Sequence, residues 1–463
     1  TDPEMGLANE WVQRAVLFFK INNTSEVIIY LLTSIIFIYF IKTVFLVFLN
    51  HKQNIFLFNL NTSLSSKLYG LYLNQSYTFH LYRNSAELLK HIQTDIPYFN
   101  SFCTSLIIVV TEFSLLLSIL ISIIWIEPIG ATFIGVFFLI LSLLFFSYTK
   151  SKMSIWGEKR RTLEEKISKI TLEGLKGFKE LKLFNRTGYY LKDFSHKKND
   201  LSNISANFTT FNLLPRYFLE LISVIVLIGF ILIMLIQERP LGTLIATLGI
   251  FVAATFKMIP SINKILSSMQ NLKYYSSAID GLIEEFKNSS KGIQKNISVS
   301  KPINLKNKIT VKDLFFKYNK NQNWILKGIN LEINKGATIG FVGPSGSGKS
   351  TFIDLFVGLL TPNSGKIIVD NIEVHADPPS WQKQLGYVPQ NIFLSDSTII
   401  ENIAFGIPQN SIDIKKIKNA LISAQLLDFV ESLPNGVYTK VGEAGVQLSG
   451  GQRQRIGIAR ALY

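Results

Sequence analysis

The chain has 463 residues, 48 % of them hydrophobic, a formal net charge of +15 at pH 7, and one cysteine, Cys103, which excludes an intrachain disulfide. Its length exceeds that of one ordinary domain and its apolar fraction exceeds that of a soluble protein, so a membrane part joined to a soluble part is expected. Because the basic residues flank long apolar runs, the charge indicates cytoplasmic loops of a membrane protein, and no nucleic-acid partner is expected.

Five apolar runs are long enough to cross about 30 Å of hydrocarbon as helices. The second and third are separated only by Glu127 and Pro128, and the fourth and fifth by residues 237–240, so each pair is a tight hairpin. Residues 149–212, by contrast, carry fourteen Lys or Arg against seven Asp or Glu, and residues 50–101 also carry basic residues. The positive-inside rule therefore places both long connections in the cytoplasm and both hairpins outside. The runs are residues 27–49, 102–126, 129–148, 213–236 and 241–259.

The long connections show helical periodicity, with an apolar side chain at every third position of residues 172–184. Helices there would extend far below the bilayer, either as solvated amphipathic helices or as levers on a soluble partner. Because five is an odd number of spans, the first run would enter from outside, so a preceding span is expected upstream of Thr1.

Three basic residues lie within different apolar runs, namely Lys42, Arg216 and Lys257. Charges in lipid are costly and normally face a bundle interior or a water-filled cavity. One interpretation is snorkelling or pairing with Glu112 and Glu220. The other is a convergent positive belt suited to a phosphate-bearing headgroup, in which Arg216 offers a bidentate fork.

A change of composition over residues 287–307, which are rich in Lys, Asn, Ser and Gly, indicates a linker between domains. Alternating residues 309–315 and 325–333 after it predict strands, and apolar residues 338–342 predict a short strand that runs into glycines. An apolar helix is expected at residues 352–360.

The segment between that strand and that helix satisfies G-x-x-x-x-G-K-[ST], the phosphate-binding P-loop. Its glycines allow backbone N–H groups to surround phosphate oxygens at a helix N-terminus, while Lys349 reaches the β and γ phosphates and Ser350 ligates Mg²⁺. ATP and Mg²⁺ are therefore the expected cofactors, although this loop alone is shared by many ATPases, GTPases and kinases. The motif comprises Gly343, Pro344, Ser345, Gly346, Ser347, Gly348, Lys349, Ser350 and Thr351.

A second glycine motif, followed by the apolar and basic residues 453–462, distinguishes among these classes. At these residues the chain resembles the ABC transporter ATPases, whose signature is LSGGQ at the start of a helix. The serine and glycines would place donors at a positive helix end, ready for a terminal phosphate. The motif comprises Leu448, Ser449, Gly450, Gly451 and Gln452.

Other residues match the same family in the same order. The resemblance implies that Tyr318 stacks on adenine and that Gln390 senses Mg²⁺ and contacts the membrane domain. It also implies that residues 442–445 form the X-loop of exporters and that residues 412–433 belong to the helical subdomain. His375 precedes the signature, so it is interpreted as a loop residue and not as the family's switch histidine.

The resemblance further implies a Walker B strand ending in Asp-Glu, a D-loop and a switch histidine after the signature, beyond Tyr463. The catalytic residues are therefore unknown from this sequence. We expect the complete protein to be an ATP hydrolase coupled to transport, and a chain that ends here to turn over ATP poorly because it lacks the catalytic base.

The expected fold is an all-α transmembrane domain of the ABC exporter type followed by an α/β P-loop ATPase domain that is incomplete at its C-terminus. The expected domains are residues 1–286, a linker at 287–307, and residues 308–463. Since the family binds ATP between the P-loop of one subunit and the signature of the other, a second half-transporter is implied, most simply an identical one. Coupling helices near residues 84–89 and 172–184 would transmit closure.

Parts of the membrane half, especially residues 215–220, 257–263 and 274–277, resemble bacterial flippases of lipid-linked oligosaccharides. This implies a lipid-linked anionic substrate, contact with membrane lipids, and a bacterial inner membrane with the ATPase domain in the cytoplasm. A multidrug, lipid A or peptide exporter is the alternative. A membrane-anchored regulatory P-loop ATPase is a further alternative, which five spans disfavour. The substrate's identity and the choice between homodimer and heterodimer stay open.

Overall fold

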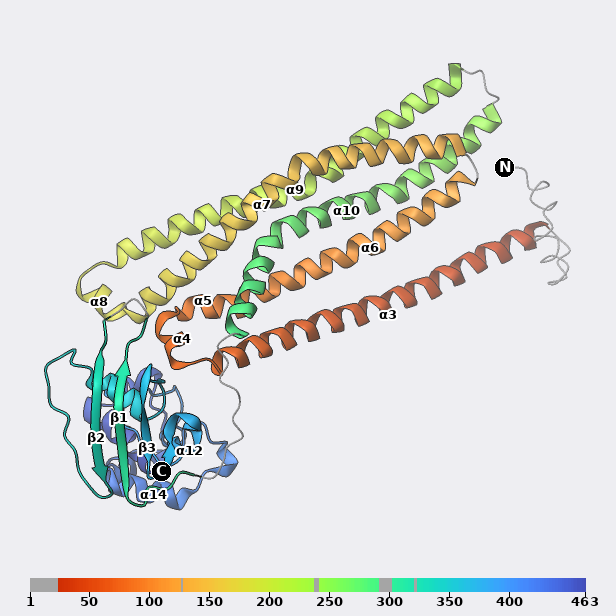
Figure 1. Cartoon of the computed structure of the whole chain (residues 1–463). Coiled ribbons are helices and arrows are strands. Elements are labelled where there is room, and N and C mark those ends of the chain that lie inside the picture. Colours follow the sequence, from red (N-terminus) through yellow and green to blue (C-terminus); the bar gives the residue numbers. More distant parts are fainter. Residues whose placement is uncertain (1–23, 126–127, 237–240, 291–301, 320–322) are drawn as a thin grey trace. The chain divides into compact units, whose positions relative to one another are not determined.

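The computed structural model describes residues 24–125, 128–236, 241–290, 302–319 and 323–463 (Figure 1). The chain divides into two compact units. The first, called here the helical unit, comprises Thr1–Gln75 and Phe79–Ile293, and the second, the mixed unit, comprises Ser76–Thr78 and Gln294–Tyr463. Much of the predicted linker at residues 287–307 lies outside the described residues, so its boundaries stay a prediction.

Long helices build the helical unit (Figure 1). Helices of 49 or 50 residues are about 75 Å long, more than twice the thickness of the hydrocarbon core, so each continues well beyond an apolar run. The predicted extension of the helices into the basic connections is thereby confirmed. The bounds are α3 Thr24–Leu73, α6 Ile96–Ile124, α7 Pro128–Lys176, α9 Thr187–Ile236 and α10 Leu241–Ser290.

Four helical segments of the described chain are long and apolar enough to cross a membrane. Each overlaps one of the first four predicted runs. The fifth run, residues 241–259, forms the first part of α10, where most side chains lie outside the described residues. Both hairpin turns fall largely on residues 126–127 and 237–240, which also lie outside them. The four segments are Leu32–Leu73, Ser85–Ile124, Gly135–Lys176 and Thr187–Val226.

Short helices connect the long ones at one end of the helical unit. Asn84 caps α5, Ser85–Lys90, because its side-chain oxygen accepts a hydrogen bond from the Ala86 N–H at 2.9 Å. This helix coincides with the predicted coupling helix at residues 84–89. The continuous helix expected over residues 172–184 is instead interrupted at Gly177, a residue that weakens a helix interior. The other connecting elements are α4 Tyr77–Tyr82, the π-helix η1 His91–Asp95 and α8 Phe178–Leu183.

Apolar contacts join the long helices into a bundle. Phe138 of α7 and Leu219 of α9 are each 2 % exposed and pack with Met258 and Ile262 of α10. A second cluster at Leu68 joins α3 to the start of α6 and the end of α10. A polar contact adds to these clusters, because Lys264 Nζ of α10 donates to Glu112 Oε1 of α6 at 2.6 Å, within the second apolar run.

A four-stranded antiparallel sheet forms one part of the mixed unit, in the order β2-β1-β3-β4. In the central strand β1, Ile309 pairs with Ile333 of β2 and Val369 of β3. Alternate residues of β1 point into an apolar core that the helix after the P-loop also enters. The first two strands match the predicted ones. The bounds are β1 Lys308–Phe316, β2 Leu326–Asn334, β3 Ser364–Val369 and β4 Ile372–Glu373.

The strand expected at residues 338–342 is absent from the described structure. This segment is irregular, and Phe341 and Val342 are 42 % and 98 % exposed. A strand forms only when a neighbour accepts and donates its ladder hydrogen bonds, and no described segment pairs with this one. Residues 338–342 are apolar, but composition alone does not identify a neighbouring strand for them. The helix expected at residues 352–360 begins and ends earlier, as α11, Lys349–Phe356.

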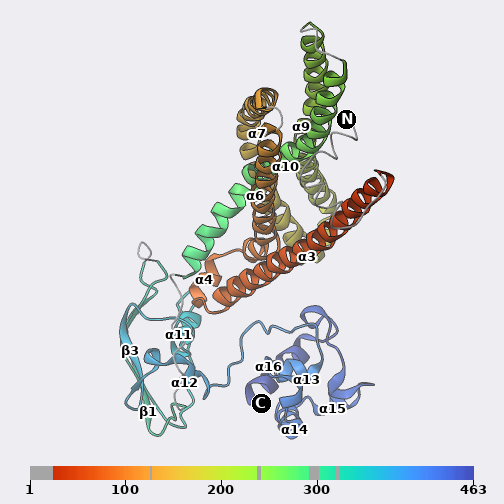
Figure 2. The same cartoon turned by 90° about the vertical axis from the view of Figure 1, so that its right-hand side faces the viewer.

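Helices form the other part of the mixed unit, which Figure 2 shows beside the sheet. They share an apolar core of their own that includes Ile403, Leu421 and Ile456. Two of them fall within residues 412–433, as predicted. The bounds are α12 Pro378–Gln382 beside the sheet, then α13 Ile399–Ile403, α14 Ile414–Ser423, α15 Leu427–Glu431 and α16 Gly450–Leu462.

Candidate functional site: a phosphate loop and a capped helix

The P-loop forms the turn that leads into α11. Gly346 and Gly348 have positive φ angles of 81° and 88°, which only glycine adopts readily, and Gly348 is the N-cap of the helix. The Phe352 N–H donates to the Gly348 carbonyl at 2.8 Å and so closes the first helical turn. The N–H groups of residues 349–351 precede any intrahelical acceptor, so they are available to an anion.

Lys349 lies across the mouth of this loop. Its Nζ donates to the carbonyls of Gly343 at 2.7 Å and Pro344 at 2.8 Å, and it lies 3.3 Å from Ser347 Oγ. These bonds hold the ammonium at the loop, where it would meet an incoming phosphate. The contact of Lys349 with the β and γ phosphates stays a prediction.

The other predicted nucleotide residues surround the start of α11. Thr351 is 8 % exposed, and its Oγ1 lies 3.3 Å from the Tyr318 hydroxyl, while the Tyr318 ring meets the Phe316 ring edge-on at 5.0 Å. Ser350 is exposed at the second helical position, next to the free N–H groups. These donors, the lysine and a hydroxyl fit a nucleotide phosphate with Mg²⁺.

Gln390 is exposed within an irregular segment. No hydrogen bond joins it to Ser350 in the described part of the chain, so their shared metal role stays a prediction.

The signature begins a helix, as predicted. Ser449 is the N-cap of α16, and its Oγ accepts from the Gln452 N–H at 3.2 Å while Gln452 Oε1 accepts from the Ser449 N–H at 2.8 Å. This reciprocal pair is a capping box. No heavy atom would approach within 4 Å of a Cβ placed on Gly450 or Gly451, so this end of the helix is open to a ligand.

The structure does not bring the two motifs together. Phe352 and Leu355 of α11 belong to the core beneath the sheet, whereas Leu448 and Ile456 belong to the helical core. Figure 2 likewise shows α11 and α16 in different parts of the mixed unit. A phosphate held by the P-loop of this chain would therefore need its signature from elsewhere.

Two local features of the mixed unit lie outside the sequence-based predictions. Thr398 caps α13 in a second capping box with Glu401, whose Oε2 accepts from the Thr398 N–H at 3.0 Å. The T-x-x-E spacing could have indicated this helix start. Asn402, which is 0 % exposed, forms a network of hydrogen bonds that no sequence pattern predicts.

The predicted belt residues have different surroundings. Arg216 Nε donates to Glu220 Oε1 at 3.0 Å, one turn along α9. Lys42 Nζ lies 5.2 Å from the centre of the Tyr39 ring, and Lys257 is exposed on α10. No described contact joins the three, so their convergence stays a prediction.

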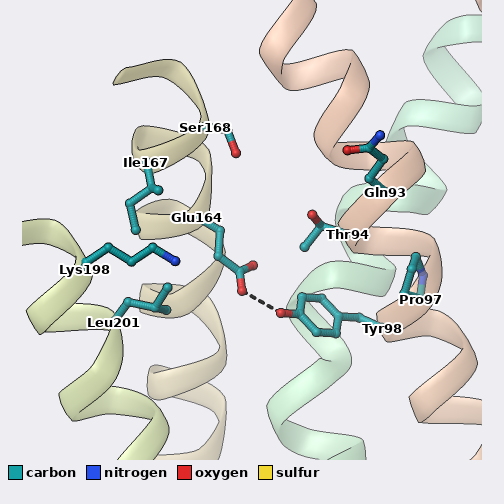
Figure 3. A pocket seen from close by; sticks show the side chains of 9 residues that line it. All are labelled: Gln93, Thr94, Pro97, Tyr98, Glu164, Ile167, Ser168, Lys198 and Leu201. Carbon is teal, nitrogen blue, oxygen red and sulfur yellow. Dashed lines mark hydrogen bonds between the residues drawn. The ribbon is translucent and has the colours of Figure 1, made fainter. Parts of the chain in front are cut away.

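A polar cavity of about 330 Å³ opens between η1, α6, α7 and α9 (Figure 3). The Tyr98 hydroxyl of α6 donates across the cavity to Glu164 Oε1 of α7 at 2.6 Å, and Lys198 extends from α9 on the Glu164 side (Figure 3). The predicted belt residues do not line it. The lining residues are Gln93, Thr94, Pro97, Tyr98, Glu164, Ile167, Ser168, Lys198 and Leu201.

Comparisons with known families match both parts of the chain. Residues 7–258, more than half of the chain, match the family described as the ABC transporter transmembrane region. Residues 326–463 match the family described as ABC transporter. A solved structure of a bacterial Atm1-family ABC exporter with ATP bound has a TM-score of 0.77 at 20 % identity, covering 97 % of this chain and 79 % of that one. This similarity concerns the fold.

Curated relatives are similar over shorter stretches. The ABC transporter B family member 29, chloroplastic, of Arabidopsis thaliana is 36 % identical over 214 residues, which are 46 % of this chain and 34 % of that protein. The ATP-dependent lipid A-core flippase of Paraburkholderia xenovorans is 29 % identical over 315 residues, 66 % of this chain and 51 % of that protein. The chain thus spans about half the length of these relatives, or less.

Proposed function

Because this chain belongs to the ABC transporter family, with a helical transmembrane region followed by an ABC ATPase domain, we propose that it forms one half of an ATP-driven exporter. The observation that supports the proposal is that the P-loop and the signature are both formed but lie apart within the chain. Lys349 bonds to the carbonyls of the phosphate loop, and Ser449 caps a helix with an open N-terminus. The helices that carry them, α11 and α16, pack in different apolar cores. A second half-transporter, most simply an identical chain, would bring its signature to this P-loop.

The residues of this chain have distinct tasks in that proposal. The N–H groups of residues 349–351 and the Lys349 ammonium would hold the phosphates, Ser350 and Gln390 would hold Mg²⁺, and Tyr318 would offer its ring to the base. Bound ATP and Mg²⁺ supply the phosphoryl group and the charge compensation for hydrolysis. Lys349 would exchange its bonds to the Gly343 and Pro344 carbonyls for bonds to phosphate oxygens, so the loop would respond to ATP binding. Closure would then pass through the helices at 84–89 and 172–184, shifting the membrane part between two states.

For the substrate we propose a lipid with a phosphate-bearing headgroup, with a lipid-linked oligosaccharide as the first candidate. Lys42, Arg216 and Lys257 on three helices support an anionic headgroup. A lipid A-type molecule is the second candidate, favoured by the several relatives described as lipid A-core flippases. The proposed setting is a bacterial inner membrane, crossed several times, with residues 308–463 in the cytoplasm.

The test uses the full-length protein in proteoliposomes, with ATP-dependent translocation of a polyprenyl-pyrophosphate oligosaccharide and of lipid A measured side by side. Arg216→Ala and Lys257→Ala are expected to lose translocation while basal ATPase activity is kept. Lys273→Ala is the matched control, because Lys273 is an exposed lysine of the same helix beyond the apolar run. Translocation unchanged in both belt variants would reject the belt. An inactive ATPase in the unaltered protein would reject the exporter.

A further inference from the structure

A single buried amide connects the segments around the signature helix. Asn402 lies on α13 and is 0 % exposed. Its Oδ1 accepts from the Ser395 N–H at 3.0 Å, and its Nδ2 donates to the carbonyls of Ser395 at 3.0 Å and Thr398 at 3.1 Å and to Ser397 Oγ at 3.2 Å. A buried amide with this many partners fixes the backbone around it, because each bond would be costly to leave unmade.

The first segment that Asn402 holds is the loop of residues 395–398, which follows Gln390. This loop in turn forms hydrogen bonds with residues 439 and 441, which precede the signature. The Val441 N–H donates to the Ser397 carbonyl and the Ile399 N–H donates to the Thr439 carbonyl, both at 3.0 Å. The Gln447 N–H then donates to the Val441 carbonyl at 3.3 Å, immediately before Leu448. A chain of hydrogen bonds therefore leads from the amide to the signature turn.

The second segment that Asn402 holds is the far end of the signature helix. Arg460 of α16 donates from Nε to the Asn402 carbonyl at 2.8 Å, and its Nη2 lies 3.5 Å from Asn402 Oδ1. The guanidinium also lies over the Phe405 ring at 4.9 Å. Since α16 begins at Gly450, contacts around Asn402 reach both the entry and the exit of this helix.

We propose that Asn402 is a positioning residue for ATP turnover, which sets the signature turn at Ser449 relative to the loop that follows Gln390. The inference rests on the proposed ATPase function and deepens it. The network is independent of the P-loop, because α11 packs in the core beneath the sheet and α13 packs in the helical core. Loss of the amide should therefore slow turnover without weakening the binding of ATP to the P-loop.

The experiment compares Asn402→Ala with Leu421→Ala and Ile417→Val in the full-length protein, measuring kcat for ATP, the Kd for a fluorescent ATP analogue and the melting temperature. The controls loosen the same helical core, since Leu421 and Ile417 are each 1 % exposed in it, and neither joins the amide network. Asn402→Ala is expected to lower kcat by about tenfold or more, as misplacement of a reacting group does. The Kd should stay within about twofold, as expected for separate sites.

The control whose melting temperature falls as far as that of Asn402→Ala should keep its kcat within about twofold of the unaltered protein. Equal loss of kcat in that control would show that Asn402 only stabilises the fold, and a parallel rise in Kd would place its effect at the P-loop. Either result overturns the proposal. Ser397→Ala removes one hydrogen-bond partner of the Asn402 amide and should give a smaller loss of kcat. This variant replaces Asn402→Ala in the test if Asn402→Ala does not fold.

The unaltered protein separates the two levels of inference. If it hydrolyses ATP and Asn402→Ala does so equally well, the positioning role is wrong and the exporter proposal stands. If it does not hydrolyse ATP, both are wrong.

Discussion

Alanine substitutions in the P-loop region give a graded test of the phosphate site. Gly348 has φ of 88°, and a Cβ there would lie 3.0 Å from Leu326 Cδ2 and 3.1 Å from Ile325 Cγ2. Gly346 has φ of 81°, but a Cβ there would meet no atom within 4 Å. Gly340 precedes the loop, is equally open, and lacks a left-handed φ. The three positions therefore separate backbone strain from steric contact.

The expected costs follow from this geometry. An alanine held at left-handed φ costs about 1–2 kcal/mol, which is the whole expected effect at Gly346. Contacts of 3.0–3.1 Å with two side chains add about 1–3 kcal/mol of overpacking at Gly348. Gly340→Ala should be neutral or stabilise by about 0.4–1 kcal/mol through the unfolded chain. The predicted order of destabilisation is thus Gly348→Ala, then Gly346→Ala, then Gly340→Ala.

The assay is the Kd for ATP in the full-length protein, together with its melting temperature. A loop that relaxes to relieve strain loses the geometry that holds phosphate, so the Kd for ATP rises. A cost of about 2 kcal/mol corresponds to roughly a thirtyfold rise in Kd. Equal Kd values for Gly346→Ala and Gly340→Ala would refute the strain argument, and equal values for Gly348→Ala and Gly346→Ala would refute the contact argument.

Three further predictions concern other parts of the chain. Ser449→Ala removes the cap that Gln452 reciprocates, so the melting temperature should fall by an amount equivalent to about 1 kcal/mol and ATP turnover should fall further, whereas Ser449→Asp should keep the stability. Burial lowers the pKa of His375 below its ordinary value, so the neutral ring stabilises the fold above about pH 6.5 and this contribution is lost as the pH falls toward the lowered value. Melting temperatures between pH 7 and pH 5 should therefore decline more steeply in the unaltered protein than in His375→Gln, and equal slopes would contradict this. Glu285→Gln removes one of the two carboxylates that pair with the half-buried Arg83, the other being Glu87, so it should lower the melting temperature more than Glu332→Gln, which alters an exposed ion pair.

The features that the sequence predicted well depend on neighbours in the chain. The P-loop and the signature are each set by a few consecutive residues, so Gly348 and Ser449 could be assigned as helix caps from their spacing. The length of the first four apolar runs and the charges that flank them were likewise sufficient to predict helices long enough to cross a membrane. Helix continuation beyond the apolar runs followed from the periodicity of the basic connections.

The features that the sequence missed depend on partners distant in the chain. Residues 338–342 have strand composition, yet they form no strand in the described structure because no described segment pairs with them. Asn402 is an ordinary polar residue by sequence, and its hydrogen bonds arise because residues 395–398 and Arg460 lie against it. The break at Gly177 interrupts a segment whose apolar periodicity by itself predicts a continuous helix.

The proposed belt shows how the two kinds of information combine. Arg216 and Glu220 are four residues apart, the spacing that places side chains together on a helix, and the structure pairs them at 3.0 Å. An anionic headgroup must therefore compete with a carboxylate for Arg216, and the competition lowers the net gain from that contact. Lys257 has no ion pair among the described residues, and Lys42 has an aromatic neighbour, which a phosphate need not displace. The strength of the proposed belt thus depends more on the two lysines than on Arg216.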